Sequence, residues 1–126
     1  MKMEPIADLL VTNGQGTLGT DIFINMIPGN NVGIMLKEPG TGSKINYELP
    51  GFIKTSFQMV VRKKLYVDGK ALITAAVAAL TIDETTLTGM YIKYMRPRHD
   101  PIQFPLTPGN NQEFLVNIDV CYVLLL

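Results

Sequence analysis

The chain has almost none of the residues on which common catalytic and metal sites depend. Its 126 residues include one cysteine, one histidine, two serines and no tryptophan. A single cysteine cannot form an intramolecular disulfide, and one cysteine with one histidine excludes the usual zinc sites. His99 and Asp100 are the only adjacent histidine and carboxylate, and no G-x-S-x-G nucleophile motif occurs. We therefore expect no enzyme activity, no metal and no cofactor.

Charge is also scarce, and it is balanced. Eleven Lys and Arg face eleven Asp and Glu, and charged residues make up only 17% of the chain against 47% hydrophobic. A net charge of zero argues against a protein held on nucleic acid by bulk electrostatics. No apolar run approaches about 18 residues and the N-terminus lacks the apolar core of a signal peptide, so we expect a cytoplasmic protein without membrane contact.

The hydrophobic periodicity predicts one α+β domain over residues 1–126. Its single antiparallel or mixed β-sheet carries two helices on one face, in the order α-β-β-β-α-β-β. The helices are expected at 5–12 and 66–80, and the strands at 21–27, 32–37, 57–62, 90–96 and 112–125. The first two strands are expected to form a hairpin across the turn 28–31, and 81–88 is expected to be a connection. Residues 38–54, with at most a short strand at 45–49, and 97–111 are expected to be protruding loops.

One face of this sheet has an unusual composition. The last strand should place Phe114, Val116, Ile118 and Val120 on the helix-covered core. Its other face alternates apolar and polar side chains, as do the matching faces of the neighbouring strands: Leu115, Asn117, Asp119, Cys121, Val123, Gln58, Val60, Phe23 and Asn25. A solvated face should be plainly polar. This face therefore indicates either contact with another subunit or cover by the 38–54 loop.

Two further patterns have simple alternative interpretations. Residues 14–19 read G-x-G-x-x-G, but here a helix precedes the glycines and a strand follows, the reverse of a dinucleotide site, so we interpret them as a connector. Basic residues gather at 62–64 and at Lys93, Arg96 and Arg98. Such clusters are usually solvated, although Arg62 and Arg96, at the ends of two strands, could meet at one sheet edge and contact phosphate.

The two long loops keep apolar side chains that a solvated loop does not need. We expect Tyr47, Phe52, Phe104 and Leu106 to dock on a partner, with Tyr47 and Phe104 as the anchors. Prolines at 97, 101, 105 and 108 stiffen the second loop and lower the entropy lost on docking. The alternative is that these side chains fold back onto the domain's own core.

Three blocks of the chain, in matching order, give it a family resemblance. They are Gly14-x-Gly16-Thr17-x-Gly19-Thr20-Asp21-Ile22-Phe23 with Pro28, then Phe57-Gln58-Met59-Val60-Val61-Arg62 before an alanine-rich helix, and Pro101…Leu106…Asn110…Phe114-x-Val116-Asn117-x-x-Val120. With these blocks the chain resembles bacteriophage minor capsid and tail-terminator (tail-completion) proteins. It departs from them at Asn111-Gln112, where the family often has Gly-Arg, and in a longer 97–108 segment.

The resemblance implies a structural virion protein that is assembled in the host cytoplasm. Such proteins form homo-oligomeric rings, typically hexamers, that cap the tail tube, stop its polymerisation and present a docking surface to the head connector. The implied partners are other copies of the chain, the tail tube protein, the head-completion or connector protein, and non-specific DNA in the channel. The alternatives are a head-completion or neck-ring protein, a small nucleic-acid-handling module, and a small-ligand domain with its site under the 38–54 loop.

Two sets of residues follow as candidates for these contacts. The subunit or partner interface is assigned to Phe23, Tyr47, Phe52, Gln58, Phe104, Leu106 and Asn117. Contact with channel DNA or an acidic partner is assigned to Arg62, Lys63, Arg96 and Arg98.

Overall fold

The computed structural model describes residues 3–27, 31–38, 44–45, 51–107 and 111–125. For 44–45 and 105–107 it describes the backbone and not the side chains. Over these residues the chain forms two helices and eight strands. Their bounds are α1 Glu4–Thr12, β1 Ile22–Ile24, β2 Gly33–Lys37, β3 Lys44–Ile45, β4 Ile53–Lys63, α2 Tyr66–Leu80, β5 Ile82–Leu87, β6 Met90–Pro97, β7 Ile102–Thr107 and β8 Asn111–Leu124.

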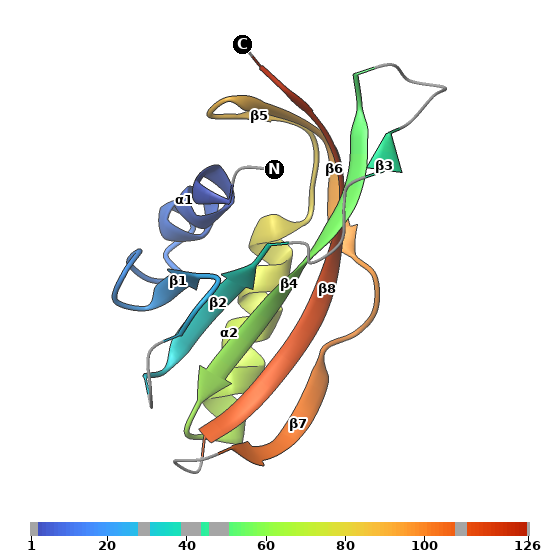
Figure 1. Cartoon of the computed structure of the whole chain (residues 1–126). Helices are drawn as coiled ribbons and strands as arrows, with labels where there is room; N and C mark the ends of the chain where they lie inside the picture. The colour runs from blue at the N-terminus through green and yellow to red at the C-terminus, as the bar shows by residue number, and fades with distance from the viewer. Residues whose placement is uncertain (1–2, 28–30, 39–43, 46–50, 108–110, 126) are drawn as a thin grey trace.

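All the strands belong to one mixed sheet, which confirms the predicted α+β class. Its order is β1-β2-β4-β8-β6-β5, with β3 paired to β4 and β7 to β8 (Figure 1). β1 and β2 are parallel and the other pairs are antiparallel. β8 is the longest strand and lies at the centre, where it pairs with β4 along eleven consecutive residues, from Gln112 to Tyr122.

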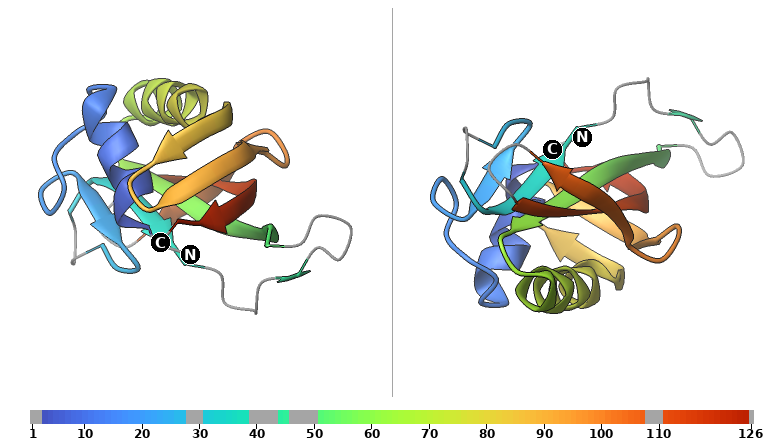
Figure 2. Two further views of the ribbon diagram at one scale, coloured as in Figure 1. Left: turned by 90° about the horizontal axis from the view of Figure 1, so that it is seen from above. Right: turned by 90° about the horizontal axis from the view of Figure 1, so that it is seen from below.

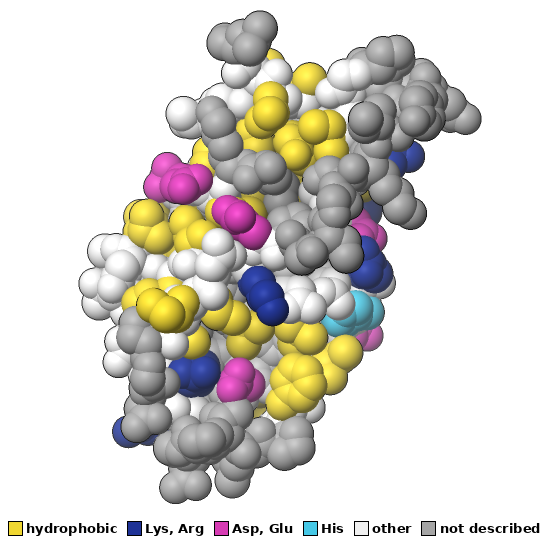
Figure 3. All heavy atoms as spheres, viewed as in Figure 1, with side chains coloured by type: hydrophobic (Ala, Val, Ile, Leu, Met, Phe, Trp, Pro, Cys, Tyr) yellow, Lys and Arg dark blue, Asp and Glu magenta, His cyan; other side chains and the backbone are white. Residues whose placement is uncertain are grey.

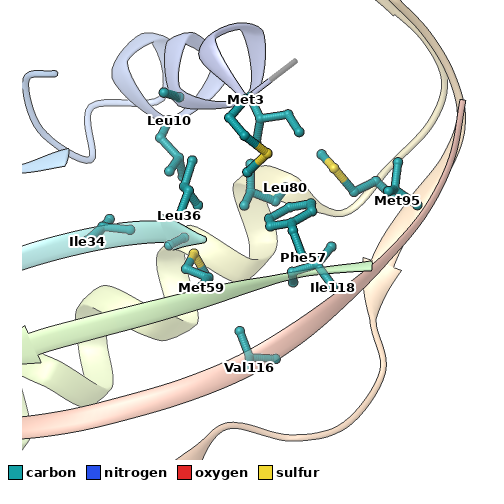
Figure 4. Close-up of a cluster of buried hydrophobic side chains, with 14 of the residues drawn as sticks. Met3, Leu10, Ile34, Leu36, Phe57, Met59, Leu80, Met95, Val116 and Ile118 are labelled. Carbon is teal, nitrogen blue, oxygen red and sulfur yellow. The ribbon is translucent and has the colours of Figure 1, made fainter. Parts of the chain in front are cut away.

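Both helices pack on the same face of the sheet, and the sheet bends around them (Figure 2). The predicted alternation of β4 and β8 is confirmed, because Phe57, Met59 and Val61 on one strand and Phe114, Val116, Ile118 and Val120 on the other are buried. Figure 4 shows the ring of Phe57 in the same cluster as Met3 of the N-terminal segment and Leu80 of α2. The core therefore lies between the helices and the concave side of the sheet.

The many alanines of α2 suggest that its small side chains bring the helix close to the sheet, but most of them do not face the sheet. Among Ala71, Ala75, Ala76 and Ala79 only Ala76 is fully buried, and Ala71 is exposed. Gly69 makes the contact instead, since a Cβ at this position would overlap the ring of Phe114. The helix can therefore lie close to β8 because one residue in its first turn has no side chain.

The expected hairpin at 28–31 is wrong, because β1 and β2 run parallel. β1 also ends at Ile24, since Asn25 adopts a left-handed φ of +67°. In that conformation the Asn25 amide donates to the Leu36 carbonyl at 2.8 Å, and its Oδ1 accepts from the Glu38 amide at 2.9 Å. Met26, which the expected strand 21–27 included, lies beyond the end of β1 and is 68% exposed.

The predicted order also missed strands. Residues 82–87, expected as a connection, form β5 against β6, and residues 102–107, expected within a loop, form β7 against β8. β8 is long enough to pair with β6 through Leu124–Ile118 and then with β7 through Leu115–Asn111. The described part of the 97–111 segment is therefore a paired strand rather than a free arm. In the 38–54 segment, β3 covers 44–45 and β4 starts at Ile53, while residues 46–50 lie outside the described residues.

Candidate functional site

The candidate site is the face of the sheet that neither helix covers, which we call the open face. Strand register places one apolar residue from each of five neighbouring strands on it in a line: Phe23 pairs with Met35, Met35 with Val60, Val60 with Leu115, and Leu115 with Ile102. We call these five residues the apolar row. Paired residues share a face of the sheet, so the row crosses β1, β2, β4, β8 and β7.

The apolar row is buried at one end and exposed at the other. Phe23, at the β1 end, is only 8% exposed, the three residues in the middle are half-buried, and Ile102 lies outside the core cluster. Exposure rises toward β7, where Ile102 is 47% exposed and Phe104, two residues further along the same face, is 43% exposed. Figure 3 shows hydrophobic side chains gathered over the lower part of this face among separate charged groups. A face of this composition is typical of a surface that contacts another protein.

A polar band runs beside the apolar row. Lys37, Gln58 and Asn117 are aligned by register, so Gln58 and Asn117 lie where the sequence placed them. The Asn117 amide nitrogens on the backbone and side chain lie 3.3 Å and 3.0 Å from His99 Nε2, and His99 Nδ1 lies 2.7 Å from the Asp100 carbonyl oxygen. The single histidine of the sequence therefore has both ring nitrogens in contact with Asn117 of β8 and the neighbouring Asp100, rather than with a side chain that could act as a nucleophile.

The predicted interface residues do not all meet. Phe23 and Phe104 lie at the two sides of the open face, whereas Phe52 lies at the other end of the sheet, with its ring 6.3 Å from that of Tyr91. Tyr47 lies outside the described residues. Leu106 lies in β7, but its side chain is not described. Phe104 is exposed rather than folded onto the core, which favours the docking interpretation of that side chain.

The basic residues are likewise not gathered at one edge. Arg62 and Arg96 pair across the sheet with Glu113 and Asp119 of β8, positions about 20 Å apart along an extended strand. Lys63 follows Arg62 in β4 and so points to the other face.

Carboxylates also accompany these cations. Arg62 lies 3.7 Å from Glu113, Arg96 lies 3.0 Å from Asp83, and Arg98 lies 2.6 Å from Asp119. The same pattern extends to Lys93, which lies 2.9 Å from Glu84. The hydrogen bond from Arg98 to Asp119 and their mutual attraction raise the pKa of Arg98, and Glu84 raises the pKa of Lys93 in the same way. Each of these four cations is thus paired with a carboxylate, in agreement with the balanced composition.

The charged side chains of β5 and β6 also line a shallow groove. Its volume is about 300 Å³ and its walls are Asp83, Glu84, Lys93, Tyr94 and Arg96. The guanidinium of Arg96 lies 4.8 Å from the ring centre of Tyr94 and is already paired with Asp83. Because the charged side chains that line this groove already form ion pairs with one another, the groove is poorly suited to bind a charged small molecule.

No group of three His, Cys, Asp or Glu side chains able to hold a metal ion occurs among the residues that the structure describes. None of the helices in that part of the chain is long and apolar enough to cross a membrane. The arrangement suits contact with a macromolecular surface.

Sequence reasoning missed Met35 as a site residue and placed Ile102 in a loop. Ile102 belongs to the apolar row because β7 pairs with β8, and Met35 because β2 pairs with both β1 and β4. The available signal was the alternation Ile34, Met35, Leu36 in β2, which leaves Met35 on the face opposite the core.

The fold has solved counterparts. One is a chain of the virion of a native gene transfer agent particle, with a TM-score of 0.58 and 11% sequence identity over 94% of this chain and 84% of that one. This likeness concerns the fold. No curated protein matches the sequence.

The family follows from the sequence itself. The profile of the family described as bacteriophage tail terminator protein matches residues 9–123, which include the C-terminal part of α1, the whole of α2 and all of the sheet strands except the last residue of β8. The chain therefore belongs to the bacteriophage tail terminator family and is a structural component of a phage virion.

Proposed function

We propose that this protein is the ring-forming terminator of a phage tail: it caps the tail tube, stops its polymerisation and provides the surface on which the head connector docks. The observation that carries the proposal is the open face with its apolar row, in a member of the tail terminator family. A domain of about 14 Å radius of gyration cannot enclose a duplex alone. A channel for DNA therefore requires several copies, and heterologous contacts that close produce a ring.

The resemblance favours six subunits, with the tail tube protein and the head-completion or connector protein on the two sides of the ring. We assign the contacts with neighbours to Phe23, Gln58, Phe104 and Asn117 on the open face. Phe52, Tyr47 and Leu106 are assigned to the same role from the sequence. The protein acts in the neck region of the virion after assembly in the host cytoplasm.

The basic residues are proposed to contact DNA in the channel or an acidic partner. Arg62, Arg96 and Arg98 each lie beside a carboxylate, so such a contact exchanges one ion pair for another. The pairs of Arg96 and Arg98 are exposed to solvent and contribute about 0–1 kcal/mol each, so their exchange costs little, whereas the pair of Arg62 is largely buried.

The direct test is polymerisation of purified tail tube protein in the presence of this protein. We expect tubes to become shorter as the added protein increases, because each capped end stops growing. Tube lengths that do not respond to a folded, stoichiometric excess of the protein would contradict the proposal.

Phe104→Ala tests the assigned surface in the same assay. Phe104 is 43% exposed and outside the core cluster, so the melting temperature of the subunit should stay within about 2 °C of wild type while capping is lost. Leu18→Ala is the matched control, since Leu18 is also 43% exposed but lies before β1, at the other side of the sheet from Phe104. Equal capping by the two variants would remove Phe104 from the interface.

A head-completion or neck-ring protein is the second candidate. It shares the small size and the ring, but binds the head rather than the tube. Binding to isolated heads and not to tubes would favour that function.

A further inference from the structure

The outer side of α2 is a second apolar surface that no role above uses. From Ala71 to Leu80 the helix has no charged residue, and Thr74 is its only polar one. A helix that is apolar all round is normally buried, whereas only one side of α2 faces the core, through Gly69, Ile73, Ala76 and Leu80. The other side of the helix is left without cover in a single subunit.

Large hydrophobic side chains are exposed at the start of this side. Leu65 is 64% exposed and Val67 73% exposed. A shallow groove of about 530 Å³ continues from them along the helix, lined by Tyr66, Val67, Lys70, Ala71, Thr74, Ala75 and Ala78. Lys70 is the only charged residue in this lining. The surface therefore combines exposed large side chains with a groove of small ones.

This surface and the open face lie on opposite sides of the molecule, because α2 covers the other side of the sheet (Figure 2). Their dimensions also match. The twelve steps from Tyr66 to Ala78 extend about 18 Å along a helix. The apolar row crosses five strands, or four inter-strand spacings, which is about 19 Å.

We propose that α2 of one subunit packs along the apolar row of the next, so that the ring is built by front-to-back contacts between the two layers. This inference rests on the proposed ring and names the surface that covers the open face. The partner is a second copy because one such contact covers both unpartnered surfaces, and its repetition around an axis closes a ring. A symmetric contact between two α2 helices would leave the row and Phe104 exposed.

The charges beside the row are compatible with this contact. Arg62 and Glu113, which flank it on β4 and β8, form an ion pair with side chains only 16% and 19% exposed. The pair contributes no net charge, so packing a helix over it buries no uncompensated group. In this arrangement the neighbouring subunit covers Arg62, and Arg96 and Arg98 are left for the contact with DNA or an acidic partner.

Extension of the sheet from one copy to the next is disfavoured at each long edge. β1 has only three residues and its start is bridged by Leu18. β5 is interrupted at Glu84, which has a φ of +47°, and β7 contains Pro105, which has no amide hydrogen to donate. Faces rather than edges are therefore left for the subunit contact.

The test uses two variants of the full chain, each with one surface disrupted. Val67→Asp places a charge on α2, and Ile102→Asp places one on the row; both positions are well exposed in the subunit, so its fold should be kept. Native mass spectrometry at micromolar concentration should find rings for the wild type and monomers for each variant alone, with association weakened at least about 100-fold. Met26→Asp is the control, since Met26 is 68% exposed and lies off both surfaces, and it should form rings.

Mixing the two variants gives the decisive result. Each retains one intact surface, so an equimolar mixture should form a heterodimer, in which the α2 of Ile102→Asp covers the row of Val67→Asp. Rings formed by Val67→Asp, dimers formed by Ile102→Asp alone, or a mixture that stays monomeric would overturn the inference. Ala71→Arg gives an independent second disruption of α2, because Ala71 is exposed. A wild type that stays monomeric, both alone and with tube protein, would refute the ring itself rather than only this contact.

Discussion

Gly69 is the residue at which α2 comes closest to the sheet. Its missing side chain leaves room for the ring of Phe114, which also packs against Tyr66 with ring centres 5.7 Å apart. The position looks unfavourable in the sequence, since glycine in a helix interior costs about 1 kcal/mol relative to alanine. Packing against a residue 45 positions away explains why glycine is placed here.

We predict that Gly69→Ala destabilises the protein by up to about 2 kcal/mol. The added Cβ overlaps the ring of Phe114, and overpacking costs about 1–3 kcal/mol against a helix-propensity gain of about 1. Denaturant titration measures the change. Thr74→Ala, on the exposed side of the same helix, should leave the free energy of unfolding unchanged or slightly increased. Higher stability of Gly69→Ala than of wild type would contradict this packing.

Cys121 is buried on the open-face side of β8, outside the core cluster. Burial raises the pKa of its thiol above the ordinary 9.0, although Lys54 and Lys93 oppose the shift. The neutral thiol is therefore favoured in the folded state. Its contribution to stability is present below pH 9 and is lost as pH rises through the raised pKa.

The thiol should consequently react slowly. At pH 8 we expect a disulfide reagent to label Cys121 at least about tenfold more slowly in folded protein than in denaturant. A cysteine introduced at the exposed Thr74, in a Cys121→Ala background, should react at the denatured rate. Fast labelling of folded wild type would show that β8 is accessible at this point.

The elements that the sequence predicted well are those with a clear period. α2 begins and ends where its pattern predicts, and β4 and β8 alternate between core and open face as expected. β5 was missed because its sequence Ile-Asp-Glu-Thr-Thr-Leu has little apolar alternation, and β7 because prolines flank and interrupt it. Both strands are specified by partners far along the chain rather than by local pattern.

The parallel β1–β2 pair was missed for a related reason. A Pro-Gly-Asn-Asn turn between two short strands indicates a hairpin, but the left-handed Asn25 ends β1 before that turn. Gly33, with a φ of +142°, then lets β2 approach β1, because a Cβ there would overlap the Asp21 carbonyl oxygen. Positive φ at an asparagine cannot be distinguished in the sequence from an ordinary turn position.

We predict that Asn25→Ala destabilises this edge by about 2–3 kcal/mol. Alanine bears a left-handed penalty of about 1–2 kcal/mol, and the hydrogen bond to the Glu38 amide, worth about 1 kcal/mol, is lost. Asn25→Gly loses only the hydrogen bond, so its cost should be about 1 kcal/mol. Hydrogen exchange at Glu38 should accelerate in both variants. Equal stability of the two variants would mean that the backbone conformation at this position carries no strain.

At the scale of the whole molecule, the sequence predicted the composition of the open face but not its organisation. It placed Phe23, Gln58 and Asn117 on one surface, and the structure agrees. The alignment of the apolar row depends on strand register. The predicted grouping of Arg62 with Arg96 is wrong, because the residues of β8 that they pair with, Glu113 and Asp119, lie six positions apart along that strand. Both the register of the strands and the distance between the two arginines are set only when the sheet is assembled, so local sequence does not reveal them.

The basic residues make a prediction at this scale. Replacing Arg62, Lys63, Arg96 and Arg98 together by Gln should keep the fold. The exposed pairs of Arg96 and Arg98 contribute little to the melting temperature, so any decrease should come mainly from Arg62, whose pair with Glu113 is largely buried. Head joining and DNA ejection should be impaired if these side chains contact the channel DNA or an acidic partner. A variant with Lys93→Gln alone, which also breaks an ion pair, controls for general loss of charge. Normal joining and ejection by the fourfold variant would show that the four residues only face solvent.

The central claim is that this protein closes the end of a tail tube as a ring. Cryo-electron microscopy of purified tubes incubated with the protein tests it most directly. The account predicts one closed ring at a single end of each tube, with six subunits in which α2 of each lies on the apolar row of the next. Bare tube ends beside free protein, or rings bound to the head and never to tubes, would contradict it.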